Sequence, residues 1–338
     1  MRGAWGAMLI ALAGCGSKGS DACSGECTAA QYCDVVADVC VARVTEFAVG
    51  ADAGALHDPH AIIIGLNGDL WFTETQPSAI GRITVDGVIT EFATPTPNAS
   101  PISLAVQPDG YILFLEGIGA VGVLTPAGVM KEYPFGVANN GHIAADSAEA
   151  YFTVDLADEI GRFDLGGDLS GGSTFTPVNG SPTLIAQGPD GHAWVDLGGQ
   201  LTPLSKVGSV VATGTDTNTG LVTGADVRLY TIGTTAVSTG SETHIKRLDT
   251  TTNTVDDFQV PKVNAGSDGI TVGPDGFIWF TEPDALRIGR LETHVYSSTG
   301  QFVEFPVPAA PAGIVTGPDG NLWFTEPTAG KIARFNPR

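Results

Sequence analysis

The most constraining feature of this 338-residue sequence is a motif that recurs along most of its length. Its clearest copies are Gly-Leu-Asn-Gly-Asp-Leu-Trp-Phe-Thr-Glu (65–74), Gln-Pro-Asp-Gly-Tyr-Ile-Leu-Phe-Leu-Glu (107–116), Gly-Pro-Asp-Gly-Phe-Ile-Trp-Phe-Thr-Glu (273–282) and Gly-Pro-Asp-Gly-Asn-Leu-Trp-Phe-Thr-Glu (317–326). Weaker copies centre on Tyr151, on Trp194 and near Leu229. The six intervals between Trp71 and Trp323 average 42 residues, the length of one four-stranded propeller blade. Seven copies therefore predict seven blades.

Each copy is expected to contain four strands. In the first copy these strands are predicted over Ala61–Ile64, Leu70–Thr73, Ile80–Thr84 and Val88–Phe92. The first of them is wholly apolar, which is typical of a strand buried between neighbouring blades. Asn67-Gly68 and Asp86-Gly87 supply residues that tolerate a positive φ in tight turns. Because helical periodicity is absent from the repeats, the sequence predicts an all-β fold.

The two ends of the repeat region complement each other. The last copy stops after Lys331–Phe335, its third strand. Val44–Val49 copies the fourth-strand pattern of Ile89–Phe92 and Phe302–Phe305. We therefore expect the N-terminal strand to complete the last blade and close the ring, which would remove exposed sheet edges. The predicted propeller spans residues 43–338 as one domain.

The first residues have the pattern of an export signal. Arg2 precedes a short apolar run, Ala7–Ala13, which is too short to cross a bilayer. Leu12-Ala13-Gly14-Cys15 resembles the lipobox of bacterial lipoproteins. This resemblance implies a signal peptide over residues 1–14, cleavage before Cys15 and a lipid on the Cys15 thiol. The expected location is exported and lipid-anchored, at the outer membrane or the cell surface.

Four more cysteines fall close together after the lipobox: Cys23, Cys27, Cys33 and Cys40. An even number of cysteines in an exported chain predicts two disulfides, and three pairings are open. A zinc site is the competing interpretation, but these four cysteines contain no C-x-x-C pair. We interpret residues 15–42 as a lipidated, Cys-rich spacer.

The charge is strongly acidic and limits the choice of partners. Acidic residues outnumber basic ones by 37 to 16, and the formal net charge is −21. Such a surface repels nucleic acid and anionic lipid headgroups, so we expect no nucleic-acid partner and membrane contact through the lipid anchor only. The chain is expected to be a monomer.

Residues that recur in the blades differ in meaning from residues that break the repeat. Glutamates end several copies of the motif, and an arginine follows in most blades; both sets are interpreted as structural ion pairs or strand-end hydrogen bonds. These residues are Glu74, Glu116, Glu282 and Glu326, and Arg82, Arg162, Arg247, Arg290 and Arg334.

His60 breaks the repeat at the entrance to an inner strand. The corresponding position in other blades is Ile102, Asn140, Thr183, Asp268 or Ala312. Because the first two strands of a blade are antiparallel, we expect His60 and Asp58 to lie on the same rim as Glu74, with His57 nearby. A histidine beside two carboxylates can act as a general base or help to hold a metal. A hydrogen-bonded loop histidine is the alternative.

The segment Pro-His-Ala-Ile…Leu-Trp-Phe-Thr-Glu…Ile-Gly-Arg-Ile…Gly-Val-Ile-Thr-Glu-Phe (59–92) resembles the units of streptogramin B lyase, also called virginiamycin B lyase. That family is a seven-bladed propeller that opens a cyclic depsipeptide by elimination across an ester C–O bond, with Mg²⁺. The resemblance implies that His60 is the proton acceptor and that Asp58 and Glu74 are metal ligands. The family's second, substrate-binding histidine corresponds to Ala312, and its aromatic residue corresponds to Ile102.

Two main functions follow from these observations. The first is Mg²⁺-dependent C–O elimination that opens a cyclic depsipeptide lactone or a related ester, with a small cyclic peptide bound at the propeller channel. The second is a non-catalytic surface module that binds a protein, peptide or glycan. A six-bladed, calcium-dependent lactonase is disfavoured because the sequence contains seven anchors.

Overall fold

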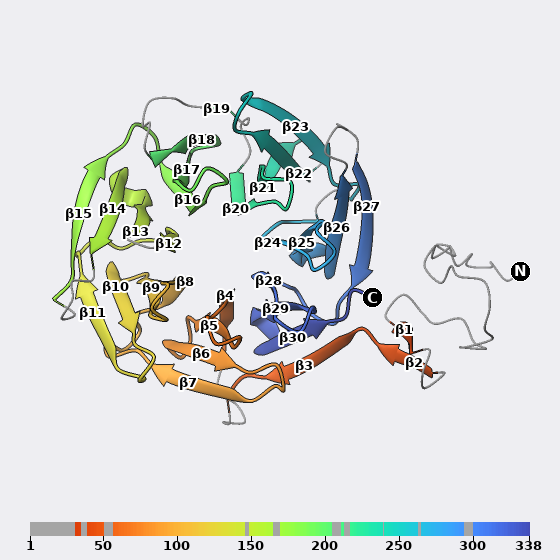
Figure 1. Ribbon diagram of the computed structural model, residues 1–338, viewed down its shortest axis with the longest axis horizontal. Helices are drawn as coiled ribbons and strands as arrows, with labels where there is room; N and C mark the ends of the chain where they lie inside the picture. The colour runs from red at the N-terminus through yellow and green to blue at the C-terminus, as the bar shows by residue number, and fades with distance from the viewer. Residues whose placement is uncertain are drawn as a thin grey trace, which may run out of the picture.

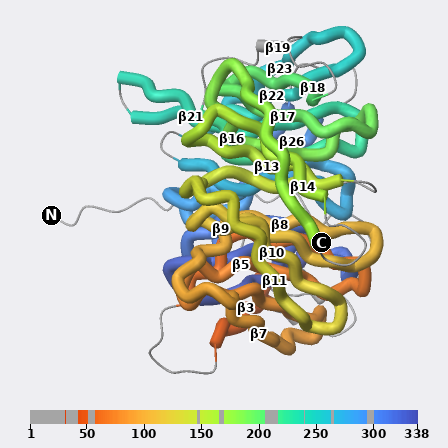
Figure 2. Tube along the Cα trace, turned by 90° about the vertical axis from the view of Figure 1, so that its left-hand side faces the viewer, coloured from red at the N-terminus to blue at the C-terminus, as the bar shows by residue number. Residues whose placement is uncertain are grey.

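The computed structural model is a ring of seven four-stranded antiparallel sheets (Figure 1). The structure describes residues 31–34, 39–50, 57–145, 149–164, 170–204, 211–212, 217–238, 240–262, 265–293 and 300–338. Figure 2 shows the ring from the side, with the long hairpin of blade 5 projecting beyond it. The predicted seven-bladed, all-β fold is confirmed. No helix in the described part of the chain has the length and apolar character of a membrane span.

The strands follow the chain blade by blade, from the centre of the ring to its outside. Blade 1 contains β4 (Pro59–Ile64), β5 (Leu70–Glu74), β6 (Ala79–Ile83) and β7 (Ile89–Ala93). Blade 2 contains β8 (Pro101–Val106), β9 (Ile112–Glu116), β10 (Ala120–Leu124) and β11 (Met130–Pro134). Blade 3 contains β12 (Ile143–Ala145), β13 (Ala150–Val154), β14 (Glu159–Asp164) and β15 (Gly172–Pro177).

The remaining blades repeat this order. Blade 4 contains β16 (Pro182–Gln187), β17 (Ala193–Leu197), β18 (Gln200–Pro203) and β19 (Val211–Ala212), and blade 5 contains β20 (Thr217–Thr223), β21 (Leu229–Val237), β22 (Gly240–Asp249) and β23 (Thr254–Gln259). Blade 6 contains β24 (Ile270–Val272), β25 (Ile278–Glu282), β26 (Arg287–Thr293) and β27 (Gly300–Pro306). Blade 7 contains β28 (Ile314–Thr316), β29 (Leu322–Glu326), β30 (Lys331–Phe335) and β3 (Val44–Ala48). Short 3₁₀ turns occupy Asp155–Ala157, Pro283–Ala285 and Pro327–Ala329.

The N-terminal strand closes the ring as the sequence predicts. β3 pairs antiparallel with β30, from Val44 opposite Phe335 to Ala48 opposite Lys331. Phe47 stacks on Trp323 with ring centroids 5.4 Å apart, so side-chain packing supports the backbone pairing. The last blade is therefore built from both ends of the propeller sequence.

A two-stranded hairpin, β1 (Gln31–Asp34) and β2 (Val39–Ala42), precedes the ring. Its register places Cys33 opposite Cys40. The two predicted disulfides stay a prediction. The signal peptide, Cys15, Cys23 and Cys27 lie outside the described residues.

Aromatic anchors hold the blades through a repeated set of contacts. In blade 6, Trp279 is fully buried, its Nε1 donates to Asp275 Oδ1 at 3.0 Å, and the Arg290 guanidinium lies 5.4 Å from its ring centroid. Blade 7 repeats the arrangement around Trp323. Arg82, Arg290 and Arg334 thus cover aromatic rings, and Arg82 and Arg290 also pair with turn aspartates, in keeping with a structural role.

The structure corrects two details of the predicted repeat. The anchor of blade 5 is Tyr230, not Leu229, because Tyr230 lies opposite Arg247 and its hydroxyl donates to Asp226. In the first turn, Gly68 alone has a positive φ, and its N–H donates to the Gly65 carbonyl oxygen. The expected tight turn would have two residues with positive φ. The structure instead has a longer loop in which only the last residue, a glycine, has a positive φ.

The recurring glutamates form no ion pairs with the recurring arginines. Glu74, Glu116, Glu282 and Glu326 are fully buried at the ends of the second strands. Burial, together with a glutamate on the fourth strand, raises the pKa of each carboxyl, to about 8 for Glu116 and about 7 for the other three. Each of these buried carboxyls therefore lies near a more exposed glutamate of the same blade and not in an ion pair with a recurring arginine.

Candidate functional site

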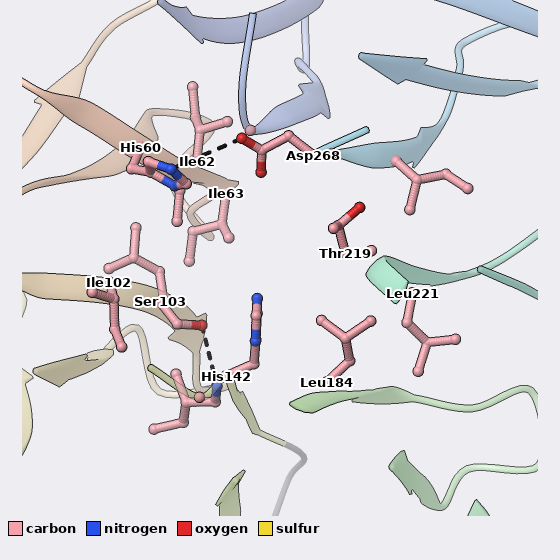
Figure 3. A pocket seen from close by; sticks show the side chains of 18 of the residues that line it. His60, Ile62, Ile63, Ile102, Ser103, His142, Leu184, Thr219, Leu221 and Asp268 are labelled. Atoms are coloured by element: carbon pink, nitrogen blue, oxygen red, sulfur yellow. Dashed lines mark hydrogen bonds and ion pairs between the residues drawn. The ribbon is translucent and has the colours of Figure 1, made fainter. Parts of the chain in front are cut away.

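The inner strands surround a cavity of about 470 Å³ at the centre of the ring. Its walls are mostly apolar, with Ile102, Leu184 and Leu221 among the side chains that face it (Figure 3). Polar side chains enter it from several blades, among them His60, His142, Thr219 and Asp268. A cavity with apolar walls and a few convergent polar groups is typical of a ligand site in proteins.

His60 and Asp268 form a pair across the cavity wall (Figure 3). His60 Nε2 lies 3.9 Å from Asp268 Oδ2, and the side chains are 46% and 33% exposed. Burial raises the pKa of Asp268, and the neighbouring His60 opposes this rise. The pair can stabilise an imidazolium on His60 after it accepts a proton, because the carboxylate lies beside the charge.

Small residues in blade 7 let blades 1 and 6 approach each other. Ala312 occupies in blade 7 the position that His60 and Asp268 occupy in their blades. A Cβ on Gly313 would lie 2.5 Å from the His60 carbonyl oxygen, so only glycine fits there. That carbonyl accepts a hydrogen bond from Thr325 Oγ1 at 2.6 Å. The backbone of His60 is thereby fixed against blade 7.

His142 presents a second imidazole to the same cavity, from blade 3. Its Nδ1 lies 2.9 Å from the Thr183 carbonyl oxygen. Because a carbonyl oxygen only accepts, Nδ1 carries the proton, and Nε2 holds a lone pair in the neutral ring. Burial lowers the pKa of His142 and so favours this neutral form.

Asp58 and Glu74 lie at the expected end of blade 1, but neither carboxylate lines the cavity. Pro59 is opposite Glu74 in the β4–β5 register, as the antiparallel argument predicts. One carboxylate oxygen of Asp58 accepts from Thr75 Oγ1 at 2.6 Å. Glu74 Oε2 lies 2.8 Å from His57 Nδ1. The structure therefore groups Glu74 with His57, while His60 faces the channel.

A metal ion implied by the resemblance can be compared with these donors. Glu74 suits a cation because its Oε1 is buried with no hydrogen-bond partner among the described residues. In the described part of the chain, the group of three potential ligands close enough to share an ion is His57, Glu74 and Glu91. Asp58 does not belong to this group.

Two residues of the cavity, Asp268 and His142, were not predicted as functional residues. Asp268 was visible as the residue that replaces His60 in blade 6, but nothing in one sequence shows that blades 1 and 6 meet across blade 7. His142 aligns with Ile62, so a polar residue at an apolar inner-strand position was its signal. The signal for Asp268 was a charged side chain at the position that His60 occupies in blade 1.

Solved structures show the same architecture. A structure described as streptogramin B lyase is 25% identical, covers 87% of this chain and 97% of its own, and has a TM-score of 0.71. A catalytically inactive virginiamycin B lyase from Staphylococcus aureus, with quinupristin, is 24% identical, covers 87% and 99% of the two chains, and has a TM-score of 0.73. The latter comparison shows the fold alone.

Sequence comparison points to the same relatives. A virginiamycin B lyase from Nocardia farcinica is 29% identical over 235 residues, which are 65% of this chain and 76% of the relative. The model of the virginiamycin B lyase family matches residues 33–201 and 204–338. Since these two segments include nearly all of the propeller, the chain belongs to the virginiamycin B lyase family.

Proposed function

We propose that this protein is a carbon–oxygen lyase that opens a cyclic depsipeptide lactone or a related cyclic ester, with His60 as the base. The observation that carries this proposal is the position of His60, in a central cavity and paired with Asp268. The family relationship agrees with it.

In the proposed reaction, His60 accepts a proton from the carbon next to the C–O bond. The electron pair of the broken C–H bond forms a C=C bond, and the ester C–O bond breaks. The carboxylate leaves with the electron pair of the C–O bond, so the ring opens without the addition of water. Asp268 stabilises the imidazolium that forms on His60.

The channel residues give this proposal a binding geometry. Ile102, Leu184 and Leu221 offer apolar surface to the ring of a cyclic peptide. His142 offers an Nε2 lone pair that accepts a hydrogen bond from a substrate amide. We infer that His142 orients the substrate, in place of a second histidine at the Ala312 position.

Mg²⁺ remains part of the proposal, with Asp58 and Glu74 as its suggested ligands. If bound there, it would supply positive charge for the developing carboxylate of a substrate that extends beyond the cavity, since neither ligand lines the cavity. The buried, unpartnered Oε1 of Glu74 supports a cation at that residue. The hydrogen bond that Asp58 accepts from Thr75 would have to rearrange if Oδ2 became the ligand atom.

The proposal is tested by incubating the purified chain with a streptogramin B and Mg²⁺ and analysing the products by liquid chromatography and mass spectrometry. Elimination gives a linear product of unchanged mass, whereas hydrolysis adds the mass of one water. We expect turnover by the wild type and a loss of about 10²–10⁴-fold in His60→Ala, the usual contribution of a general base. Equal turnover by both proteins would rule out His60 as the base.

A binding module is the second candidate, favoured by the mostly apolar cavity wall. It predicts that a cyclic peptide binds and remains intact. Calorimetric titration on the same samples separates the two functions, because saturable binding without product supports the binding module over the lyase.

A further inference from the structure

The buried glutamates of blades 1, 6 and 7 differ in the source of the positive charge near them, whereas in blade 2 the residue opposite Glu116 is Ala120, which carries no charge. In each of four blades, a buried glutamate at the end of the second strand lies near a glutamate on the fourth strand. The pairs are Glu74 with Glu91, Glu116 with Glu132, Glu282 with Glu304, and Glu326 with Glu46. Two neighbouring carboxylates require a proton or a cation to offset their repulsion.

Blades 6 and 7 carry the cation in their own sequence. The residue opposite the buried glutamate, at the start of the third strand, is Arg287 in blade 6 and Lys331 in blade 7. Arg287 pairs with Glu304, and Lys331 Nζ lies 3.1 Å from a Glu46 oxygen. Each fourth-strand carboxylate is therefore neutralised from the adjacent strand.

Blade 1 has the same two carboxylates without that cation. The residue opposite Glu74 is Ala79, whose side chain carries no charge. His57 takes its place from the segment before β4. Its Nδ1 lies 2.8 Å from Glu74 Oε2 and 3.6 Å from Glu91 Oε1. An imidazole nitrogen here replaces the basic side chain of blades 6 and 7.

The three donors are arranged as metal ligands are. One ligand atom from each of His57, Glu74 and Glu91 lies within 4.8 Å of the other two. Metal–ligand bonds of about 2.0–2.2 Å place neighbouring ligand atoms roughly 3–3.5 Å apart, so small shifts suffice. Glu74 is fully buried and its Oε1 has no partner among the described residues, whereas Glu91 is 32% exposed. The open side at Glu91 gives an ion access.

We propose that His57, Glu74 and Glu91 bind one divalent transition-metal ion, of which Zn²⁺ is the probe of choice. One imidazole and two carboxylates suit Zn²⁺ better than Mg²⁺, which prefers oxygen ligands alone. The site shares Glu74 with the proposed Mg²⁺ pair, but it requires neither Asp58 nor turnover.

The test is isothermal titration of the purified chain with Zn²⁺ and with Mg²⁺, without substrate. We expect one Zn²⁺ per chain, bound at least tenfold more tightly than Mg²⁺, together with a rise in Tm. His57→Gln and Glu91→Gln should each weaken Zn²⁺ binding at least tenfold. Glu304→Gln, the matched change in blade 6, should leave Zn²⁺ binding unchanged.

A gain-of-charge variant makes the comparison between blades decisive. Ala79→Lys gives blade 1 the lysine that blade 7 has at Lys331, and it should abolish Zn²⁺ binding in a protein that keeps its fold by circular dichroism. Zn²⁺ binding that survives His57→Gln or Ala79→Lys, or the absence of one-to-one binding in the wild type, would overturn the site. Because these titrations do not measure activity, failure of the lyase proposal would leave the Zn²⁺ result intact.

Asp58→Asn separates the Zn²⁺ site from the proposed Mg²⁺ pair, since it should weaken Mg²⁺ binding only.

Discussion

The second strands of the blades and the channel ends of their inner strands follow opposite rules. In the second strands the repeat is kept, and Trp279 and Trp323 make matching contacts with an aspartate and an arginine. At the channel ends the repeat is broken, and His60, His142 and Asp268 enter the cavity from three blades. The comparison teaches that repetition supports the ring, while deviation from it provides the candidate chemistry.

The largest expected effect tests the structural half of this comparison. Trp323→Ala should destabilise the protein by about 3–5 kcal/mol, because it leaves a large cavity beside the closing strand. Trp323 is fully buried and stacks on Phe47. Chemical denaturation measures the cost. Leu156→Ala, at a side chain 67% exposed, is the control and should change stability by less than about 0.5 kcal/mol. Similar costs for both variants would contradict the assignment.

The next effect tests the channel half. Asp268→Asn should lower kcat/KM on a turned-over cyclic ester by about 10²-fold, or roughly 2.7 kcal/mol, with little change in Tm. Asp284→Asn, an exposed change in the same blade, should leave the rate unchanged. A fall in Tm with an unaltered kcat/KM would make Asp268 purely structural.

A smaller effect concerns the buried glutamates at the ends of the second strands. The pKa of Glu116 in the folded protein is about 8, above its ordinary value of 4.5, so the folded state favours the protonated form. Its contribution to stability is full below pH 4.5, declines as the pH rises and is lost above about pH 8. Glu116→Gln mimics the protonated carboxyl and should raise Tm by a few °C at pH 9, with less change at pH 5. Thermal scans across this range check the sign, and an equal shift at both values would contradict it.

The smallest expected effect concerns the exposed contacts of the arginine repeat. Asp275→Asn keeps an oxygen for the Trp279 hydrogen bond. It removes the ion pair in which Arg290 Nη1 lies 3.1 Å from Asp275 Oδ2. Partly exposed pairs contribute about 0.2–1 kcal/mol. The difference from wild type should shrink in 1 M salt, as denaturation at two ionic strengths would show. A salt-independent loss would mean that the turn, not the charge, was disturbed.

The fold could be predicted from the sequence because each copy of the motif independently indicates the same four-stranded unit. Trp71, Trp279 and Trp323 set the blade length, and the fourth-strand pattern of Val44–Val49 revealed the closure. The contacts between side chains in the channel could not be predicted in the same way. His60 stood out because it breaks the repeat, but its contact with Asp268 depends on how closely blade 7 brings blades 1 and 6 together. That distance depends on the small residues Ala312 and Gly313, whose importance appears only in three dimensions.

The placement of Glu74 was unpredictable for a related reason. Strand register correctly set it opposite Pro59, but register alone does not determine which neighbours a buried carboxylate meets. His57 reaches it from a segment outside the strands, and Glu91 comes from the far edge of the blade. The partner was visible in the sequence only as a second histidine near His60.

The pairing of β3 with β30 has a thermodynamic consequence for any molecule held in the channel. His60 and Asp268 come from the two blades on either side of blade 7, the blade that this pairing completes. A compound that touches both side chains binds best to the closed ring, because opening of the seam between β3 and β30 would disturb the placement of the two blades. Occupancy and seam opening are therefore linked equilibria, and a bound ligand should slow amide exchange along the seam in proportion to its affinity.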